Sequence, residues 1–279
     1  MLNIVKSIIF GIVEGVTEWL PISSTGHMIL LNAICKLNVR QSFLAMYLVV
    51  IQLGAILAVV VLYWRKLWPL RRRRTTKDPE GQLIVDRETI AMWLKIIVAT
   101  IPAAVIGVPF DDFFESLFYN YWTVAAMLIL FGIAFILIEN RNRGARPAKT
   151  DIAQFTYRDA IIIGLFQLIA AVFPGTSRSG ATIVGALLIG ISRTAAAEFT
   201  FFLAIPAMFG GSLIKLLKFH HFASGELGIL LVGMIVAFAV SIFAIRFLMQ
   251  YIKQHDFKAF GWYRIVLGII VLGFFLIAG

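Results

Sequence analysis

The sequence predicts an all-α polytopic membrane protein with about six transmembrane helices and two re-entrant helix hairpins, arranged as an inverted repeat. Three observations indicate this fold class. First, 60% of the 279 residues are apolar and only 14% are charged, whereas about 25% are charged in a soluble domain. Second, several uncharged runs approach the roughly 20 residues that span a bilayer. Third, two polar interruptions of the apolar sequence share one pattern of residues.

Six apolar segments are predicted to span the membrane. Cations are concentrated in two segments between them, 65–88 and 139–158. Because two predicted helices separate these segments, both lie on one side, which the positive-inside rule makes cytoplasmic. The intervening segment contains Asp111, Asp112 and Glu115 and neither Lys nor Arg, as is typical of an outer loop. The predicted spans are residues 44–64, 90–110, 118–138, 199–218, 228–248 and 262–278.

The net charge of +10 does not indicate binding to nucleic acid. The cations lie in segments between apolar runs, which is how membrane topology is encoded. We therefore expect a membrane environment and no nucleic acid. The single cysteine, Cys35, excludes an internal disulfide and a cysteine-based metal cluster.

Two apolar regions, residues 4–35 and 159–192, are interrupted by Gly, Pro, Ser and charged residues. Non-helical backbone at membrane depth is tolerated only where it is buried in protein or lines a wet cavity. Both regions are therefore predicted to be re-entrant helix–loop–helix hairpins.

The two hairpins match one another at a constant offset of 153 residues. Each is followed by three predicted spans, and an odd number of crossings inserts the second copy upside down, with the two broken segments together near the midplane. We predict a single integral membrane domain, 1–279, with repeats at about 1–140 and 155–279. The matched pairs are Gly11 and Gly164, Glu14 and Gln167, Pro21 and Pro174, Ser24 and Ser177, and Thr25 and Arg178.

The first hairpin contains two carboxylates, Glu14 and Glu18, which share one helical face because they are four residues apart. Two carboxylates in an apolar helix are costly, and they persist where they bind a divalent cation, share a proton or meet a cation. We expect Mg²⁺ or Ca²⁺, since Mg²⁺ is usually bound by one or two carboxylates together with phosphate oxygens.

Hydroxyl groups follow the carboxylates in the first hairpin. Pro21 ends the helix, and Ser23, Ser24 and Thr25 precede the next one. Hydroxyls and free backbone N–H groups at the start of a helix suit an anion. His27 lies one turn further on, where it is a candidate general base, nucleophile or metal ligand.

The second hairpin contributes a cation. Arg178 is the only charged residue between Asp159 and Arg193, and a guanidinium matches a phosphate or carboxylate bidentately. An alternative is that these charges only neutralise one another, for instance Glu18 with Arg178. We disfavour it because buried ion pairs are poor stabilisers and charges inside a membrane are functional by default.

These residues resemble those of a known family. The segment Glu14-Gly-x-Thr-Glu-x-Leu-Pro-x-Ser-Ser-Thr-Gly-His27, together with Pro174-Gly-x-Ser-Arg-Ser-Gly180, resembles the undecaprenyl-diphosphate phosphatase family, also called the bacitracin-resistance proteins. The resemblance extends over nearly the whole chain. One departure is Leu48, which stands where the family commonly has an acidic residue, so that position has no catalytic or metal role here.

The resemblance implies a bacterial inner-membrane enzyme that removes the terminal phosphate of undecaprenyl diphosphate. The product, undecaprenyl phosphate, is the lipid carrier for peptidoglycan, and bacitracin resistance follows from the same activity. The resemblance also implies a divalent cation, a site facing the periplasmic side and a homodimer. The positions it implicates in this sequence are Glu14, Glu18, Ser23, Ser24, Thr25, His27, Ser177 and Arg178.

The resulting hypothesis gives each of these residues a role. Ser24 attacks the terminal phosphorus with His27 as its proton acceptor, although attack by His27 or by water remains open. A rival function from another class is a transporter or flippase of a polyprenyl phosphate or another anion, since inverted repeats with broken helices are transporter architecture. The assignments are Glu18, Ser24, His27 and Arg178 as catalytic, Ser23, Thr25, Ser177 and Arg178 as substrate-binding, and Glu14 and Glu18 as metal ligands.

Overall fold

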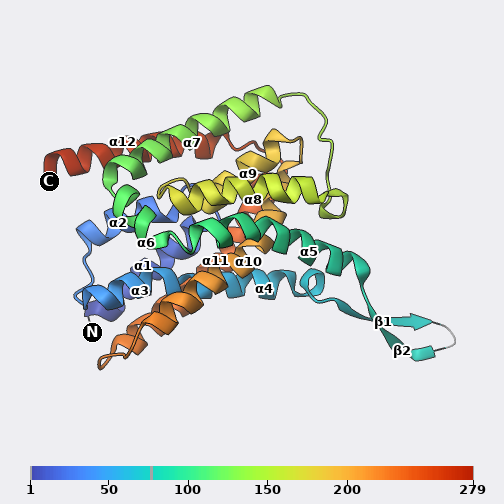
Figure 1. The fold of residues 1–279 in the computed structure, drawn as a ribbon, viewed down its shortest axis with the longest axis horizontal. Helices are drawn as coiled ribbons and strands as arrows, with labels where there is room; N and C mark the ends of the chain where they lie inside the picture. The colour runs from blue at the N-terminus through green and yellow to red at the C-terminus, as the bar shows by residue number, and fades with distance from the viewer. Residues whose placement is uncertain (1, 76–77, 279) are drawn as a thin grey trace.

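The computed structural model describes residues 2–75 and 78–278. The protein is a bundle of helices, and a two-stranded β hairpin projects from one end of the bundle (Figure 1). The first half comprises α1 (Leu2–Thr17), α2 (Ser24–Ile34), α3 (Gln41–Val50), α4 (Gln52–Leu67), β1 (Leu70–Thr75), β2 (Asp78–Val85), α5 (Arg87–Pro102), the π-helix η1 (Ala103–Gly107), α6 (Asp111–Phe118) and α7 (Tyr121–Arg141). The second half comprises the 3₁₀ turn η2 (Ile152–Gln154), α8 (Tyr157–Val172), α9 (Arg178–Leu188), α10 (Arg193–Lys218), α11 (Glu226–Tyr251) and α12 (Lys258–Ala278).

Six helical segments of the described chain are long and apolar enough to cross a membrane. Each overlaps one predicted span, and the ends differ by a few residues, so the prediction of six transmembrane helices is confirmed. The segments are Gln41–Leu67, Arg87–Gly107, Tyr121–Arg141, Arg193–Lys218, Glu226–Tyr251 and Lys258–Ile277.

The cation-rich segment 65–88 contains structure that we did not predict. β1 and β2 pair antiparallel, with Leu70 opposite Val85. Residues 83–85 are Leu, Ile and Val, of which the last two are β-branched and favour a strand, but we weighed only the charge of this segment. Lys77 lies outside the described residues. Asp86 then caps α5: Thr89 donates to it at 2.9 Å, and this bond, assisted by Glu88 N–H and Arg71, holds the pKa of Asp86 below its ordinary value.

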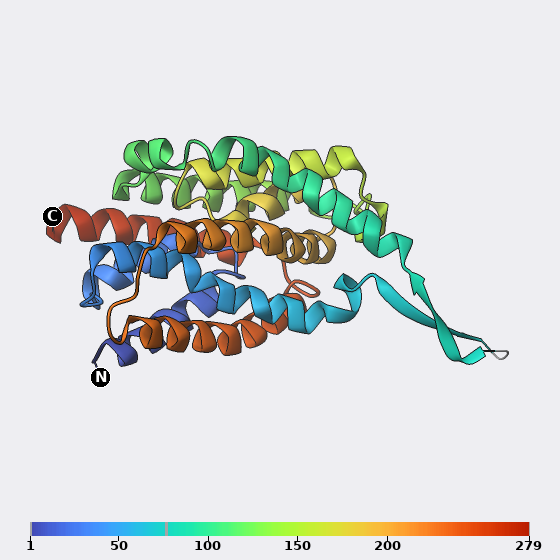
Figure 2. The ribbon, with the colours of Figure 1, turned by 60° about the horizontal axis from the view of Figure 1, so that its bottom comes forward.

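Both cation-rich segments lie at one end of the bundle, as predicted. The β hairpin and the connection between α7 and α8 are at that end in both ribbon views, whereas the chain termini and α6 are at the other (Figures 1 and 2). The first hairpin, α1–α2, begins and ends near the termini. The second hairpin, α8–α9, begins and ends at the cationic end. This opposite orientation is what an inverted repeat requires, although the membrane insertion of the two hairpins remains a prediction.

The hairpin helix of each half packs on a membrane-spanning helix of the other half. The helix α1 packs on α11, and α8, its counterpart, packs on α5; α4 also packs on α11, as α10 does on α5. Both hairpin helices approach their partners through a matched glycine. A Cβ on Gly11 would lie 2.6 Å from the carbonyl oxygen of Gly233, and one on Gly164 would lie 2.4 Å from that of Ala99. The two glycines matched by the repeat offset thus occupy equivalent positions, each where a hairpin helix comes close to the backbone of its partner helix.

A repeated ion pair ties the halves together. Arg40, at the start of α3, pairs with Glu226 of the second half at 2.5 Å. Arg193, which follows Arg40 by 153 residues and begins α10, pairs with Glu139 of the first half at 2.5 Å. Each arginine thus begins the first span of one repeat and binds an acid of the other repeat.

Candidate active site

The two polar interruptions form the same turn twice. Ser23 precedes α2 and Ser177 precedes α9, with φ of 73° and 68°, and they are the only non-glycine residues with positive φ among those described. The Ser23 Oγ accepts a hydrogen bond from Gly26 N–H at 3.3 Å, and the Ser177 Oγ accepts one from Gly180 N–H at 3.2 Å. Left-handed backbone at a non-glycine residue is strained and concentrates at functional sites.

This geometry corrects the predicted alignment by one residue. Ser177 corresponds to Ser23 and not to Ser24, and Arg178 corresponds to Ser24 and not to Thr25. The reason is an extra residue in the second break: Ser23 follows Pro21 by two residues, whereas Ser177 follows Pro174 by three. The constant offset of 153 residues was therefore wrong at these two serine turns.

Glu18 lies where the two hairpins meet. Arg178 Nη2 donates to Glu18 Oε1 at 2.8 Å, and Ser24 Oγ donates to Glu18 Oε2 at 2.7 Å. Ser179 Oγ donates to the Glu18 carbonyl at 3.1 Å. The Glu18 and Arg178 side chains are 7% and 13% exposed, so the ion pair is shielded from solvent. The structure thus contains the Glu18–Arg178 pair, and it adds the candidate nucleophile Ser24 to the same carboxylate.

The Arg178 side chain is held by the first hairpin and by α10. Its Nη1 donates to the Thr200 carbonyl at 3.1 Å, and the guanidinium carbon lies 6.0 Å from the ring centre of Trp19. These contacts fix the guanidinium beside Glu18 and leave little freedom for it to swing away.

His27 has different partners from the one predicted. Its Nδ1 lies 2.7 Å from the Ser23 carbonyl oxygen, and its Nε2 lies 2.7 Å from the hydroxyl of Tyr263 on α12. The two rings stack with 5.6 Å between centroids and 8° between planes. Because Ser24 donates to Glu18, the carboxylate and not His27 is placed to accept the Ser24 proton.

The remaining predicted residues lie around this centre. Thr25 is half-buried in the first turn of α2. Ser177 Oγ lies 3.2 Å from Ser179 Oγ, which in turn reaches Glu18. Glu14 is 1% exposed and lies in the last turn of α1, four residues before Glu18. The structure therefore brings the first and second hairpins together through Glu18, Arg178 and Ser179.

Two residues near this centre, Tyr263 and Arg264 on α12, were not predicted from the sequence. Arg264 is fully buried, and it donates to backbone carbonyls of both polar breaks. The signal was present in the sequence, because Arg264 is a charge inside the span predicted at 262–278, and such charges mark functional sites by default.

Both hairpins and Arg264 contain buried polar atoms that have no hydrogen-bond partner. Such atoms are few in native proteins and each one calls for a physical explanation. Within the described residues, every such side-chain atom belongs to a hairpin or to Arg264. They are Glu14 Oε1, Trp19 Nε1, Asn32 Oδ1, both amide atoms of Gln167, Thr176 Oγ1 and Arg264 Nε. The hairpins therefore have unused capacity to bind a polar ligand.

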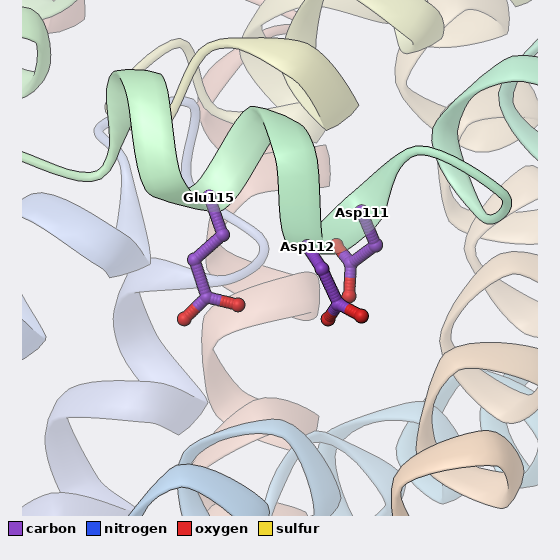
Figure 3. Close-up of side chains that lie close together, drawn as sticks. All are labelled: Asp111, Asp112 and Glu115. Atoms are coloured by element: carbon purple, nitrogen blue, oxygen red, sulfur yellow. The ribbon is translucent and has the colours of Figure 1, made fainter.

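The fit of a metal ion depends on Glu14 and Glu18. Glu14 Oε1 is buried and has no partner, which suits a cation ligand, whereas both oxygens of Glu18 already accept hydrogen bonds. Among the described residues, one cluster of three acidic side chains has the spacing for a single ion, and it lies elsewhere: Asp111, Asp112 and Glu115 on α6 (Figure 3). Those three side chains are exposed and Lys215 lies 3.4 Å from Asp111, so they do not belong to the buried centre.

The fold and the buried centre define a class: a multi-pass membrane protein in which two broken helix hairpins bring carboxylates, hydroxyls and guanidinium groups together. A family model described as "Bacitracin resistance protein BacA" matches residues 7–270. The chain belongs to this bacitracin-resistance protein family.

Full-length relatives carry one name. The chain is 62% identical over 277 residues to "Undecaprenyl-diphosphatase 1" of Clostridium acetobutylicum, covering 99% of this chain and 98% of the relative. It is 63% identical over 276 residues to "Undecaprenyl-diphosphatase" of Desulfitobacterium hafniense, covering 99% and 97%. It is 57% identical over 277 residues to the protein of the same name in Acetivibrio thermocellus, covering 99% of each.

Proposed function

We propose that this protein hydrolyses undecaprenyl diphosphate to undecaprenyl phosphate and inorganic phosphate. The reaction regenerates the lipid carrier for peptidoglycan synthesis and underlies resistance to bacitracin. The single observation that carries the proposal is Glu18, whose two carboxylate oxygens contact Ser24 and Arg178 at the junction of the hairpins. Family membership and the shared name of the full-length relatives agree with this activity.

The geometry favours Ser24 as the nucleophile. Ser24 Oγ transfers its proton to Glu18 Oε2, at 2.7 Å, and attacks the terminal phosphorus. The bond from that phosphorus to the bridging oxygen breaks, and undecaprenyl phosphate leaves with the bridging oxygen. Water then hydrolyses the phosphoserine and releases inorganic phosphate. Phosphoryl transfer needs an in-line nucleophile and stabilisation of charge more than covalent chemistry.

Phosphate binding falls to Arg178 and to the starts of α2 and α9. Each of these helices has 11 residues, and the first N–H groups of a helix have no partner within it. Arg178 adds a cation whose N–H groups not used by Thr200 and Glu18 can donate to a phosphate, and the hydroxyls of Ser23, Thr25 and Ser177 lie in the same turns. A divalent cation, Mg²⁺ or Ca²⁺, would be held by Glu14, whose buried Oε1 has no partner, and by the remaining lone pairs of the Glu18 carboxylate, and it would neutralise charge on the diphosphate.

In this mechanism His27 is a positioning residue for the turn that carries Ser24. With Nδ1 on the Ser23 carbonyl and Nε2 on the Tyr263 hydroxyl, it fixes the strained turn that carries Ser24. Attack by His27 itself or by water predicts a different outcome. A phosphoenzyme trapped by acid quench should map to Ser24 and be lost in Ser24→Ala; a phosphohistidine at His27, or a wild type that forms no phosphoenzyme, would contradict the serine mechanism.

We further propose that the protein lies in the bacterial inner membrane with this site open to the periplasmic side. The cation-rich end supports a cytoplasmic position for the segments that contain the β hairpin and residues 142–156. A homodimer is also proposed, on the resemblance alone, and light scattering in detergent measures it directly.

The decisive assay is phosphate release by the purified protein in detergent, with and without a chelator. The enzyme proposal predicts release from undecaprenyl diphosphate, and loss of release when the chelator removes the cation. The reciprocal packing of the halves also suits a transporter of polyprenyl phosphate. Transport needs two compartments and hydrolysis does not, so a protein that moves lipid across vesicles but releases no phosphate in detergent favours the transporter.

A further inference from the structure

Arg264 contacts both polar breaks from a third element, α12. Its Nη1 donates to the Pro21 carbonyl of the first break at 3.2 Å. Its Nη2 donates to the Gly175 and Thr176 carbonyls of the second break at 3.1 and 2.6 Å. These two breaks lie about 150 residues apart in the chain, and a single side chain connects their backbones.

The charge of Arg264 has no counter-ion in the described part of the chain. The residue is 0% exposed, and it takes part in none of the ion pairs formed by the described residues. Its Nε has no hydrogen-bond partner, and its guanidinium carbon lies 5.8 Å from the ring centre of Phe131. Burying a cation without a carboxylate is costly, so bundle stability alone does not account for this residue.

The bonds to Arg264 set the direction of the backbone amides. In a planar trans peptide unit the C=O and the following N–H point in opposite directions. Because the Thr176 carbonyl points to Arg264, the N–H of Ser177 points away from it. No acceptor for that N–H is found among the hydrogen bonds of residues 2–75 and 78–278. An unused N–H that begins the turn before Arg178 is a donor for a bound anion.

Gly180 leaves the space that Arg264 occupies. A Cβ on Gly180 would lie 2.6 Å from Arg264 Nη1. The second hairpin thus makes room for the guanidinium at the same turn that carries Ser177 and Arg178. An alanine here shifts the guanidinium without removing it.

We propose that Arg264 is a positioning residue that holds the two polar breaks in register, so that Ser24 and Glu18 face Arg178 and the amide of Ser177 faces the diphosphate. The inference rests on the proposed phosphatase function and adds a residue to it. Arg264 acts through the loop backbones and does not itself contact the substrate.

The test compares purified wild type, Arg264→Gln, Gly180→Ala and the double variant in detergent. Arg264→Gln is expected to lower kcat for phosphate release by about 100-fold, the cost of a misplaced reacting group, with a smaller change in KM. Gly180→Ala should lower kcat in the same way. The double variant should be no worse than Arg264→Gln, because the two changes disturb one contact.

A matched control separates positioning from loss of folding. Arg193→Gln removes another arginine from a buried acid, Glu139; Arg193 makes no hydrogen bond to either polar break among the described residues, so this change should leave kcat unchanged. Wild-type kinetics in Arg264→Gln would overturn the proposal, as would losses that multiply in the double variant. The proposal would also be overturned if Arg264→Gln and Arg193→Gln lowered the unfolding temperature by the same amount and lowered kcat by the same factor, because the loss would then reflect stability alone.

Hydrogen exchange provides a readout that does not depend on activity. Amides at 18–27 and 173–180 should exchange faster in Arg264→Gln than in wild type, and Arg193→Gln should not show this change. Unchanged exchange in both loops contradicts the proposal. If the wild type released no phosphate, the proposed function would fail, and exchange in the two loops would still decide whether Arg264 holds them together.

Discussion

At the residue scale, the Glu18 carboxylate makes two different interactions. Glu18 neutralises Arg178 through Oε1 and accepts the Ser24 hydroxyl through Oε2. A buried ion pair gives little net stability, but here it fixes the second oxygen toward the hydroxyl. In the proposed mechanism the ion pair is therefore part of the reaction centre, and this role accounts for two charges at the junction of apolar hairpins.

Glu18→Gln tests whether the Glu18 carboxylate accepts the Ser24 proton. The amide keeps the size of the side chain but cannot accept the Ser24 proton, and loss of a general base typically costs about 10²- to 10⁴-fold in rate. We expect kcat for phosphate release to fall in that range while the protein still purifies as a folded species. The control is Glu115→Gln, an exposed acid of α6, which should have wild-type kinetics. Near-normal kcat in Glu18→Gln would mean that another group takes the proton.

Tyr263→Phe tests the hydroxyl that reaches His27. The change removes the 2.7 Å contact with Nε2 and keeps the stacked ring. A hydrogen bond contributes about 0.5–1.5 kcal/mol, so kcat should fall by about two- to tenfold. Tyr119→Phe, at an exposed tyrosine after α6, serves as the matched control. Equal rates for both variants and the wild type would exclude a role for the Tyr263 hydroxyl in holding His27.

At the element scale, the hairpin helices depend on close approach to the second span of the opposite half. Composition and periodicity were sufficient to predict six spans and two broken regions, because length and charge determine them. They did not reveal which helix faces meet, since Gly11 and Gly164 touch backbone atoms of Gly233 and Ala99 that no sequence pattern identifies. The β hairpin was missed for a similar reason: β-strand preference is weak beside the signal of charge.

Gly11→Ala tests the packing of α1 on α11. The new Cβ would lie 2.6 Å from the Gly233 carbonyl oxygen, and overpacking typically costs about 1–3 kcal/mol. We expect a lower thermal unfolding temperature in detergent. Gly210→Ala is the matched control, because nothing lies within 4 Å of a Cβ there, and alanine favours a helix over glycine by about 1 kcal/mol. A Gly11→Ala protein as stable as Gly210→Ala would show that α1 and α11 separate easily.

At the scale of the whole molecule, two similar halves provide different parts of one centre. The halves pack reciprocally and repeat the strained serine turn. The first half supplies Glu18 and Ser24, the second supplies Arg178, and α12 adds Arg264 between them. The sequence was sufficient to predict this division, but the meeting of three elements at one point depends on tertiary packing that brings residues about 160 and 240 positions apart into contact.

The orientation of the whole molecule in the membrane provides the last test. Arg143 follows α7 at the cationic end, whereas Asp112 is on α6 at the opposite end (Figure 1). In a Cys35→Ser background, which removes the only cysteine, we would introduce Arg143→Cys or Asp112→Cys. A membrane-impermeant thiol reagent added to intact cells should label the cysteine at 112 and reach the one at 143 only after permeabilisation. This follows because a cation excess retains a segment in the cytoplasm. Labelling of both positions in intact cells would contradict the single orientation. Labelling of position 143 alone would invert the orientation and place the end that contains α6 on the cytoplasmic side.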